Sequence, residues 1–350
     1  MIAAAADALL RRLGVHLYEV VDDSPVVAPT IGQAEPAQVG RPRTAAETVR
    51  PRTFDEYIGQ ADAKARLQTV IQAACLRGEQ LRHILVSAPH GLGKTTLARL
   101  IADEYGAPLV ETTGGQLMKS GALAETLMGL PDGAVLFIDE IHGVGLKGQS
   151  EVAEQFYAAL DSFVLQGMRD GQPVSIPLPS FTCIGATTAA GRMDRAFVSR
   201  FLLVELTDYE REDMVQMVEA MAAKLDGLTL PASAAGAIAD RSRMNPRQAE
   251  QILAFARDAV TVRGTVELRD VFQRLGLGEL GLRRRELTVL GHLQQVGGPV
   301  GAAALANMAG VTKTEYEDSV EPWLERAGLI IRTPRGRLIT RRGVAQTTTS

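Results

Sequence analysis

The chain has 350 residues, of which 46% are hydrophobic and 22% are charged, and its formal net charge is −4. A single hydrophobic core seldom grows beyond about 250–300 residues, so this length predicts two or three domains of an ordinary globular protein. The negative net charge disfavours nonspecific binding of polyanions by the whole surface, and no apolar run approaches the roughly 18 residues needed to span a membrane. Two cysteines, Cys75 and Cys183, lie far apart among apolar neighbours. They favour buried thiols over a disulfide and so predict a cytoplasmic protein.

Residues 1–48 form the first segment, in which prolines and polar residues are frequent. This spacing predicts a mostly flexible arm, either a plain linker or a docking segment. The pattern changes at Arg50, and apolar residues then recur at helical spacing over 61–78. We expect an amphipathic helix there, followed by the first buried strand.

The most informative motif lies at 83–96, where an apolar run breaks into the turn Gly91-Leu92-Gly93-Lys94-Thr95-Thr96. The run predicts a buried strand, and the turn lets backbone N–H groups converge on an anion at the start of a helix. Lys94 would neutralise the β- and γ-phosphates of a nucleotide, and Thr95 would hold Mg²⁺. One position departs from the P-loop pattern, because Ala88 stands where the first glycine is expected. Alanine fits there unless the backbone needs positive φ.

A second motif follows the apolar run Ala134–Ile138, which ends at Asp139 and Glu140. This is typical of a central parallel strand that delivers acids to its carboxyl end, where doubly wound sheets bind ligands. Asp139 would hold Mg²⁺ through water, and Glu140 would orient or deprotonate the attacking water. On its own such a pair is more often a helix cap with a first-turn acid, but its place after a phosphate-binding loop favours catalysis.

Two more strands of this region have polar residues at their ends. The run Phe181–Ala186 ends in Thr187 and Thr188, and a hydroxyl at such a strand end can reach the γ-phosphate. Farther on, Arg200 stands at the start of a last strand over 202–206. In isolation, Arg200 would be a surface ion-pair residue.

Residues 211–277 have helical patterns throughout, which predicts a small helical lid beside the nucleotide. Its third helix has the clearest start, with Asn245 as the N-cap and Pro246 at the first helical position. Arg247 therefore lies in the first turn, and we expect it to be exposed.

The last segment predicts three helices and a β-hairpin, the pattern of a winged helix–turn–helix. The third helix, over 313–326, is rich in acids, so phosphate would repel it. The hairpin, or wing, carries Arg332, Arg335 and Arg337 instead. Because phosphate neutralisation needs clustered cations, we expect the wing to contact DNA rather than to be a merely solvated basic hairpin.

Together these motifs resemble one family, the RuvB Holliday-junction branch-migration motors of the AAA+ class, from about Arg50 to Thr340. The matching stretches, in chain order, are Arg50-Pro51, Asp55–Gln60, Gly91–Thr96, Leu136–His142, Ile184–Thr188, Ser199–Phe201 and Arg332–Arg337. The resemblance implies an α/β fold with a three-layer P-loop AAA+ core, a helical lid and a winged-helix domain. We expect the core at 49–210, the lid at 211–277, the winged helix at 278–341 and a disordered tail at 342–350.

The resemblance also implies roles for single residues around the nucleotide. Thr188 resembles the first sensor, Arg247 the second sensor on the lid, and Arg200 the finger that reaches a neighbouring subunit's ATP. Positions that line the nucleotide in the family match Arg50, Ile58 and Tyr209. An arginine that works in trans requires a neighbour in head-to-tail contact, so a closed homohexamer is expected.

The function implied by the resemblance is translocation of duplex or branched DNA, most simply branch migration, with ATP and Mg²⁺ as cofactors. Arg332 and Arg337 match the wing that contacts DNA in the family. The candidate hairpin Gln166–Ile176 is shorter and more polar than the family's, whose apolar residues dock on the junction-binding partner RuvA. A RuvA-like loading partner therefore remains open.

Two other functions also remain open. The same ATPase could remodel a protein or protein–DNA complex, with the winged helix as a docking module, and stimulation of hydrolysis by duplex DNA would separate this function from a DNA motor. Alternatively, Ala88 and His90 mark a degraded scaffold that only binds nucleotide. A scaffold that only binds nucleotide does not need the residues that hydrolyse ATP. Their joint presence therefore speaks against this function; these hydrolysis residues are Lys94, Thr95, Asp139, Glu140 and Arg200.

Overall fold

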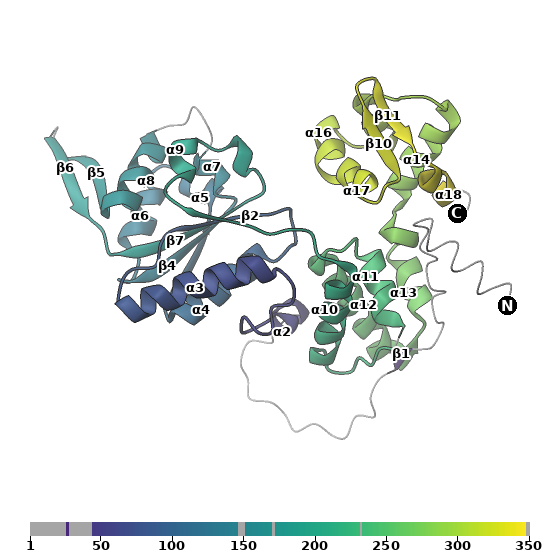
Figure 1. The fold of residues 1–350 in the computed structure, drawn as a ribbon, viewed down its shortest axis with the longest axis horizontal. Coiled ribbons are helices and arrows are strands. Elements are labelled where there is room, and N and C mark those ends of the chain that lie inside the picture. The colour runs from purple at the N-terminus through teal and green to yellow at the C-terminus, as the bar shows by residue number, and fades with distance from the viewer. Residues whose placement is uncertain (1–25, 28–43, 146–150, 170–171, 232, 348–350) are drawn as a thin grey trace. The chain divides into compact units, whose positions relative to one another are not determined.

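The computed structural model describes residues 26–27, 44–145, 151–169, 172–231 and 233–347 (Figure 1). The described part of the chain divides into two compact units. The first unit contains residues 43–217 and 244–250, and the second contains 218–243, the residues from 251 onward and the described residues before 43. No helix of the described residues is long and apolar enough to cross a membrane.

The first unit is built on a parallel sheet, which has five strands in the described residues in the order β3-β4-β7-β2-β8. The strands are β2 (Ile84–Ser87), β3 (Leu109–Thr113), β4 (Ala134–Asp139), β7 (Phe181–Thr187) and β8 (Leu202–Glu205). Ile84 of β2 pairs with Ile184 on one side and with Leu202 on the other. Both β4 and β7 are buried along nearly their whole length, as expected of parallel strands covered on both faces. Because β7 lies between β2 and β4, the carboxyl ends of all three strands meet at one edge.

Helices cover both faces of this sheet, with α3 and α4 on one face and α8 and α9 on the other (Figure 1), which confirms the predicted α/β core of three layers. The helices of this unit up to β8 are α2 (Ala45–Val49), α3 (Ala61–Arg77), α4 (Lys94–Tyr105), α5 (Gly114–Leu117), α6 (Ala122–Met128), α7 (His142–Gly145), α8 (Glu151–Ser162), η1 (Ala190–Arg192) and α9 (Arg195–Val198). Cys183 is buried in the core as predicted. Cys75 is exposed, contrary to the prediction, because the buried stripe of α3 runs through Leu67, Ile71 and Ala74 instead.

The predicted hairpin over 166–176 is confirmed and extends beyond those limits. Strands β5 (Val164–Arg169) and β6 (Gln172–Pro177) pair antiparallel, with Val164 opposite Pro177. The predicted turn residues Asp170 and Gly171 lie outside the described residues.

The predicted lid helices are present as α10 (Arg211–Lys224), α11 (Ala234–Arg241), α12 (Pro246–Arg263) and α13 (Leu268–Arg274). The arm predicted as flexible differs from the prediction at both places where it is described. Strand β1 (Val26–Val27) pairs antiparallel with β9 (Thr265–Val266), so β9 provides the pairing partner for the backbone of Val26 and Val27. Helix α2 begins before residue 48 because Thr44 and Glu47 cap each other's backbone N–H groups in a capping box.

The winged-helix segment contains the predicted helices and hairpin. Its elements are η2 (Glu279–Gly281), α14 (Arg284–Val296), α15 (Ala302–Ala309), α16 (Lys313–Glu315), η3 (Tyr316–Val320), α17 (Glu321–Arg326), β10 (Ile330–Thr333), β11 (Gly336–Ile339) and α18 (Arg341–Thr347). The third predicted helix is divided by η3, a π-helical stretch. Val300 adds a bridge to the hairpin by exchanging two backbone hydrogen bonds, of 3.0 and 2.8 Å, with Arg337. Gly336 is required beside it, because a Cβ there would lie 2.5 Å from the Val300 carbonyl oxygen.

The segment predicted as a disordered tail, 342–350, instead begins inside helix α18. The Thr340 hydroxyl accepts a hydrogen bond of 3.1 Å from the Gly343 N–H at the start of this helix. Gly343 is buried so closely that a Cβ would lie 2.3 Å from the Leu329 carbonyl oxygen. The cap and this packing order the helix through Thr347, where the described residues end.

Candidate functional site

The phosphate-binding turn lies between β2 and α4, as predicted. Gly91 and Gly93 both have positive φ, +81° and +96°, and Gly93 is the N-cap residue of α4. Side chains also fill the space beside them. A Cβ on Gly91 would lie 2.4 Å from Asn245 Oδ1, and one on Gly93 would lie 3.1 Å from the Tyr57 hydroxyl. Glycine is therefore needed at both positions for backbone conformation and for room.

Ala88 does not disturb this turn. It is absent from the described non-glycine residues with positive φ, so its methyl group causes no backbone strain. Its N–H continues the sheet by donating a hydrogen bond of 3.1 Å to the Thr187 carbonyl. The expectation that alanine fits this position is confirmed.

Lys94 is buried and points back along the turn that precedes it. Its ammonium donates hydrogen bonds of 2.9 Å to the carbonyl oxygens of Ala88 and Pro89. Burial lowers the pKa of Lys94, while the nearby carboxylates of Asp139 and Glu140 act in the opposite direction. The two acids predicted at the end of β4 thus lie close enough to Lys94 to interact with its charge. We call the phosphate-binding turn together with Lys94 the cradle. Thr95 and Thr96 follow, half-buried, in the first turn of α4.

Asp139 and Glu140 leave the sheet at a tight turn. Glu140 adopts φ +51°, and its N–H donates a hydrogen bond of 3.0 Å to Asp139 Oδ1. A non-glycine residue in this left-handed region is uncommon and is found most often where a site fixes the backbone. The backbone of Gly114 lies directly against the Glu140 carbonyl and so restrains its position; a Cβ on Gly114 would lie 2.3 Å from that carbonyl oxygen. The turn leaves the Glu140 side chain exposed.

The residues that would hold Mg²⁺ fit that role only together with a nucleotide. No group of three or more His, Cys, Asp or Glu side chains among the described residues could hold a metal ion. Thr95 offers a hydroxyl and Asp139 a carboxylate, both oxygen ligands that Mg²⁺ prefers. Mg²⁺ is commonly bound through one or two such groups plus phosphate oxygens and water. This donor set therefore fits a metal ion that enters together with a nucleotide.

Thr188, the predicted first sensor, is exposed directly after β7. Its neighbour Thr187 is buried, and the Thr187 hydroxyl accepts a hydrogen bond of 3.0 Å from the Ala189 N–H. The same hydroxyl lies 3.2 Å from His142 Nδ1. Thr187 and His142 thus fix the backbone on which Thr188 stands. The sequence indicated a hydroxyl at this strand end but did not distinguish the buried Thr187 from the exposed Thr188, and it indicated no role for His142.

A tyrosine pair lies against the phosphate-binding turn. The Tyr209 hydroxyl donates to the Leu92 carbonyl at 3.2 Å and lies 3.4 Å from the Tyr57 hydroxyl. Both rings are buried, and burial raises the pKa of both phenols, so they stay neutral. The Gln60 amide fastens the two segments by donating to the Thr207 carbonyl at 2.7 Å and accepting from the Thr207 N–H at 3.0 Å. Of this group the sequence had indicated a role for Tyr209, but for neither Tyr57 nor Gln60.

The other predicted nucleotide residues belong to the same unit. Arg50 and Ile58 are half-buried on the segment that leads into α3. Arg247 is exposed in the first turn of α12, as predicted. The predicted N-cap is also confirmed, because Asn245 Oδ1 accepts from the N–H groups of Arg247 and Gln248 at 3.1 and 3.3 Å.

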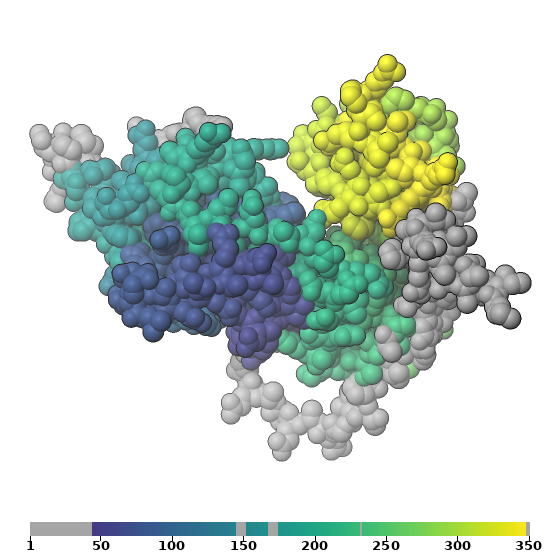
Figure 2. All heavy atoms as spheres, in the orientation of Figure 1, coloured from purple at the N-terminus to yellow at the C-terminus, as the bar shows by residue number. Residues whose placement is uncertain are grey.

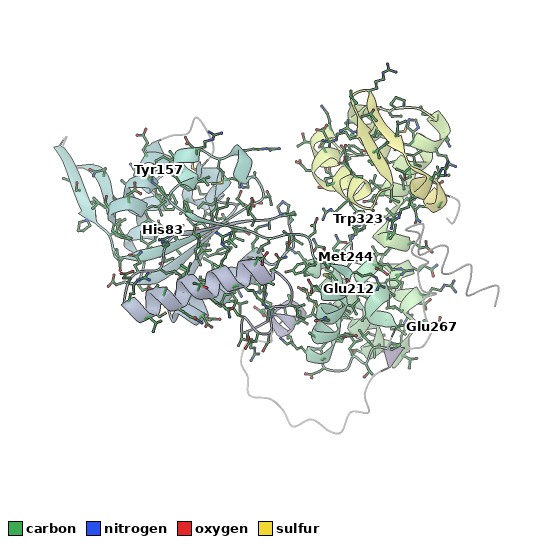
Figure 3. All side chains as sticks on the ribbon, in the orientation of Figure 1. His83, Tyr157, Glu212, Met244, Glu267 and Trp323 are labelled. Carbon is green, nitrogen blue, oxygen red and sulfur yellow. The ribbon has the colours of Figure 1, made fainter. Side chains whose placement is uncertain are left out.

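Arg200 lies at the opposite edge of the sheet from the cradle, next to the amino end of β8. Its guanidinium pairs with Asp161 at 2.7 Å and lies over the Tyr157 ring, 4.7 Å from the centroid. Figure 3 labels Tyr157 on α8 and His83 ahead of β2. Since β2 spans about 13 Å, Arg200 is far from the phosphate turn of its own chain. This position suits a residue that serves another subunit and does not suit one that acts on its own cradle.

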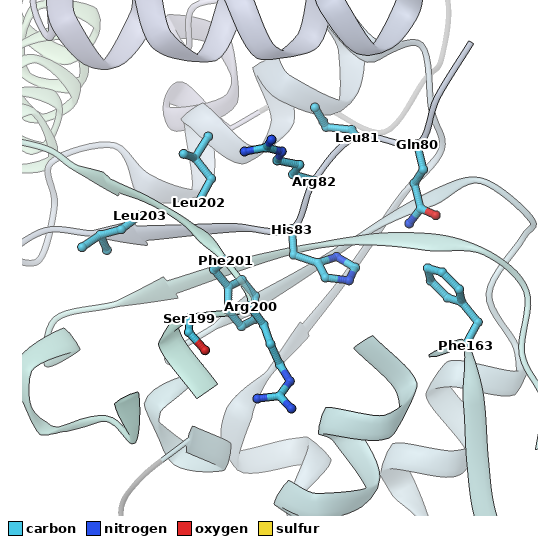
Figure 4. A pocket seen from close by; sticks show the side chains of 10 residues that line it. All are labelled: Gln80, Leu81, Arg82, His83, Phe163, Ser199, Arg200, Phe201, Leu202 and Leu203. Carbon is cyan, nitrogen blue, oxygen red and sulfur yellow. The ribbon is translucent and has the colours of Figure 1, made fainter. Parts of the chain in front are cut away.

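Beside Arg200 is an open cavity of about 470 Å³, lined by residues that lead into β2 and β8 (Figure 4). His83 forms part of its wall and is held in one tautomer. Nδ1 accepts a hydrogen bond of 2.9 Å from the Cys183 N–H, so Nε2 carries the proton and donates to the Leu160 carbonyl at 3.0 Å. Burial lowers the pKa of His83. These bonds and the rings of Phe163, Phe181 and Phe201 around it give His83 a structural role.

The wing arginines differ from one another in a way that the sequence did not indicate. Arg337 is only 13% exposed and donates two hydrogen bonds of 2.7 Å to the carboxylate of Glu321. Arg332 is half exposed and also donates to Glu321, at 3.0 and 2.9 Å. Arg335 is exposed at the turn of the hairpin, and no described acid lies within ion-pair distance of it. Figure 2 shows this C-terminal region in yellow at the surface of the winged helix.

The expected repulsion of phosphate by the third helix needs correction at Glu321. This acid is completely buried, and the two arginines neutralise it. The hydrogen bonds from these arginines lower the pKa of Glu321 against the opposing effect of its burial. Glu317 and Glu315 are also paired, with Arg337 at 3.5 Å and with Arg285 at 3.3 Å. The helix is therefore less negative at its surface than its sequence indicates.

Comparison with known proteins gives consistent matches. Residues 49–206 match the P-loop domain of the Holliday junction DNA helicase RuvB, and residues 279–347 match the RuvB C-terminal winged-helix domain. The chain is 39% identical over 305 residues to the Holliday junction branch migration complex subunit RuvB of Fervidobacterium nodosum, a match that covers 84% of this chain and 86% of the relative. It is 40% identical over 305 residues to the subunit of that name from Mycolicibacterium gilvum, with 84% of each chain covered.

A solved structure agrees with these relatives. The RuvB Holliday junction branch migration motor of Thermotoga maritima superposes with a TM-score of 0.73 at 35% identity, covering 86% of this chain and 98% of that one. Family models, full-length relatives and a solved structure thus agree over both the ATPase core and the winged helix. The chain belongs to the RuvB family.

Proposed function

We propose that this protein is an ATP-driven motor that moves branched DNA, as its relatives do in Holliday junction branch migration. The observation that carries the proposal is that the residues needed for ATP hydrolysis lie at two opposite edges of one sheet. Lys94, Asp139 and Glu140 gather at the carboxyl ends of β2 and β4, while Arg200 lies at the far edge. Such a set can be completed only by a second copy of the chain.

Within one subunit, the residues act on the phosphate chain of ATP. The N–H groups of the turn and Lys94 bind the β- and γ-phosphates, and the Lys94 ammonium has a third N–H beyond the two that bond the carbonyls of Ala88 and Pro89. Glu140 orients the attacking water and accepts its proton. Thr188 contacts the γ-phosphate from the end of β7. Thr95, and Asp139 through water, would hold a Mg²⁺ ion that enters with ATP, and this ion would supply positive charge to the phosphates.

We further propose a closed ring of six subunits. Head-to-tail contact repeats the interface between the cradle of one subunit and Arg200 of the next, and it closes when the rotation per subunit allows. An arginine supplied from a neighbour stabilises the charge that develops in the transition state, typically by a factor of about 10³–10⁵ in kcat. The partly exposed side chain of Arg200 at the edge of the sheet supports this role.

DNA is contacted through the phosphates by the wing. Arg335 and the exposed part of Arg332 carry this contact, while Arg337 holds the wing on α17 through Glu321. Phosphate contacts of this kind make affinity strongly dependent on salt and independent of sequence. A motor that moves along DNA of any sequence needs that independence.

The hairpin β5/β6 is the proposed site of a RuvA-like partner that loads the ring on a junction. Leu165 turns inward and is buried in the core, whereas Ile176 on the opposite strand is 38% exposed. Among the hairpin side chains that the structure describes, at 164–166 and 174–177, Ile176 is the large hydrophobic one that is exposed, so the partner's surface would have to bind this part of the hairpin largely through polar groups.

The decisive experiment is an unwinding assay on a four-way DNA junction, with ATP and Mg²⁺, in the presence and absence of a junction-binding partner. We expect ATP-dependent resolution of the junction into two duplexes and stimulation of ATP hydrolysis by duplex DNA. ATP hydrolysis that neither responds to DNA nor depends on salt would refute the DNA motor. It would favour the second candidate, a remodeller of protein or protein–DNA complexes that uses the winged helix as a docking module.

A further inference from the structure

We propose that the turn Arg243-Met244-Asn245 transmits the state of the phosphate-binding loop to the winged helix, with Arg243 and Asn245 as positioning residues. The proposal rests on the proposed function, since it concerns how ATP and DNA binding are coupled. The turn lies where the chain passes from one compact unit to the other, between Arg243 and Met244. Each side of the turn is anchored within its own unit.

On one side, Asn245 joins the phosphate loop to the helix that carries Arg247. Its Nδ2 donates a hydrogen bond of 2.8 Å to the His90 carbonyl in the loop. Its Oδ1 accepts from the N–H groups of the first turn of α12, at 3.1 and 3.3 Å. Capping a helix needs only an acceptor, which Ser, Thr or Asp supplies equally well. The amide donor is the additional feature, and it is bonded to the nucleotide loop.

The contact is close enough to restrict both partners. Asn245 fills the space beside Gly91, next to His90, where a Cβ would lie 2.4 Å from Asn245 Oδ1. Any movement of the loop on binding phosphate therefore changes the position of Asn245. Because Asn245 caps α12, the start of that helix and Arg247 move with it.

The backbone that leads to Asn245 is held in an unusual conformation. Arg243 and Met244 have φ of +59° and +54°, in the left-handed region that non-glycine residues rarely adopt. Two such residues in succession persist only where the surroundings fix them. Figure 3 labels Met244 at this turn, immediately before α12.

On the other side, Arg243 is fixed to the base of the winged helix. It is buried, and its guanidinium donates to the Gly281 carbonyl at 3.0 and 2.7 Å and to Glu286 Oε1 at 3.0 Å. Glu286 is also buried, in the first turn of α14, where its second oxygen accepts from the Arg283 N–H at 3.0 Å. A buried, hydrogen-bonded ion pair fixes the position of both side chains, because separating them leaves a buried charge.

The same base is tied to the helix that holds the wing. The Trp323 indole N–H donates to the Leu280 carbonyl at 3.1 Å, one residue before the carbonyl that Arg243 binds. Trp323 belongs to α17, the helix on which Glu321 holds the wing arginines. An unbroken series of described bonds therefore leads from Arg243 to the wing.

The test compares the affinity of the full-length protein for a four-way DNA junction with and without a slowly hydrolysed ATP analogue and Mg²⁺. The ratio of the two dissociation constants measures the coupling between the sites, and couplings between linked sites are commonly about 5–150-fold. Asn245→Asp keeps an acceptor for the cap but removes the donor to His90. Asn245→Ser also keeps an acceptor without adding charge near the phosphates. Glu286→Gln preserves the shape of the second anchor and removes its charge.

Two controls separate coupling from general damage. Glu315→Gln removes the charge of the exposed pair with Arg285, 3.3 Å apart in the same domain, and should leave the ratio at the wild-type value. We expect Asn245→Asp, Asn245→Ser and Glu286→Gln to bring the ratio at least about fivefold closer to one. Because both anchors belong to one path, combining Asn245→Ser with Glu286→Gln should cause no further loss.

The outcomes decide between a coupling role and a structural one. Variants that weaken junction binding equally with and without nucleotide keep the ratio, and this result would overturn the proposal. A wild-type ratio of one, or losses that add in the double variant, would also overturn it. If Glu286→Gln does not fold, the two Asn245 variants decide alone. Failure of the wild-type protein to bind the junction or to hydrolyse ATP would instead refute the proposed function.

Discussion

The guanidinium of Arg200 is paired with the carboxylate of Asp161 at 2.7 Å, and both its ion-pair partner and the ring beneath it, Tyr157, belong to α8. The guanidinium also donates a hydrogen bond to the Ala196 carbonyl of α9, so two helices fix the direction in which this arginine points. The Arg200–Asp161 pair is partly exposed, so a phosphate oxygen of a neighbouring subunit's ATP can compete with Asp161 for the guanidinium. A carboxylate pairs with arginine in much the same geometry as phosphate does.

Replacing Arg200 by alanine should separate ATP binding from hydrolysis. Binding should remain nearly intact, because Lys94 and the phosphate turn belong to the other subunit. Turnover should fall by a factor on the order of 10³, as for other arginines supplied in trans. Fluorescent-nucleotide titration and steady-state phosphate release measure the two quantities.

Mixing Arg200→Ala protein with Glu140→Gln protein should partly restore hydrolysis. A mixed ring contains some interfaces at which an intact Glu140 faces an intact Arg200, and a ring of either variant alone contains none. If mixed rings form, as shown by mass spectrometry, and remain inactive, Arg200 is only a structural partner of Asp161. Normal hydrolysis by Arg200→Ala alone would lead to the same conclusion.

Substitutions within one cradle should have two distinct effects. Lys94→Ala should abolish ATP binding, because the phosphates lose their buried counter-charge. Glu140→Gln should leave binding intact and block hydrolysis, because only the group that handles the water is changed. Calorimetric titration with ATP, together with a hydrolysis assay, distinguishes them. Equal loss of binding in both would show that Glu140 does not have the assigned role.

The wing arginines should differ in what their loss affects. Arg335→Ala should leave stability unchanged and reduce the slope of log affinity against log salt by about 0.9, the value for one phosphate contact. Arg337→Ala should destabilise the protein by about 3 kcal/mol, because it removes the main partner of the buried Glu321. DNA binding at several salt concentrations and urea denaturation measure the two effects. A salt slope that Arg335→Ala leaves unchanged would remove Arg335 from the DNA surface.

His83 should make stability depend on pH below neutrality. Burial lowers its pKa in the folded protein, so the unfolded chain takes up the proton first as the pH falls below about 6.5. Stability is therefore fully present above that pH and is lost as the pH falls toward the folded pKa, by up to about 1.4 kcal/mol per pH unit. Urea denaturation between pH 7.5 and pH 5.5 should show a smaller loss for His83→Asn than for the wild type. An equal loss in both proteins would contradict the assignment.

The fold and most of the nucleotide site could be predicted because their signals are local in the sequence. The turn around Lys94 combines a strand, glycines and a helix start within a few residues, and Asp139 and Glu140 directly follow a buried strand. Asn245 was identified as a helix cap because Pro246 follows it. In each case one short segment contains both the residue and its context.

What could not be predicted depends on pairs that are distant in the sequence. Whether Glu321 repels DNA or is neutralised depends on Arg332 and Arg337, which reach it only when the hairpin folds back over α17. The second bond of Asn245, to His90, joins segments 155 residues apart. Helix α18 has a weak local pattern, and it packs against α14 and against the Leu329 backbone, which are distant in the sequence from most of it.

The strand order has a consequence for how the chain acquires its structure during synthesis. Strand β2, which leads into the phosphate turn, pairs only with β7 and β8 in the described sheet, and these are its last two strands in the sequence. When a ribosome has released β2, β3 and β4, the strand beside the turn still lacks both neighbours, because Ile84 of β2 pairs with Ile184 of β7, which lies 100 residues later in the chain. Sheets that depend on such non-local pairing fold slowly and expose unpaired edges until the chain is complete. ATP thus has no finished cradle to bind before Glu205 has emerged, and a nascent chain that stalls earlier is a candidate for chaperones or proteolysis.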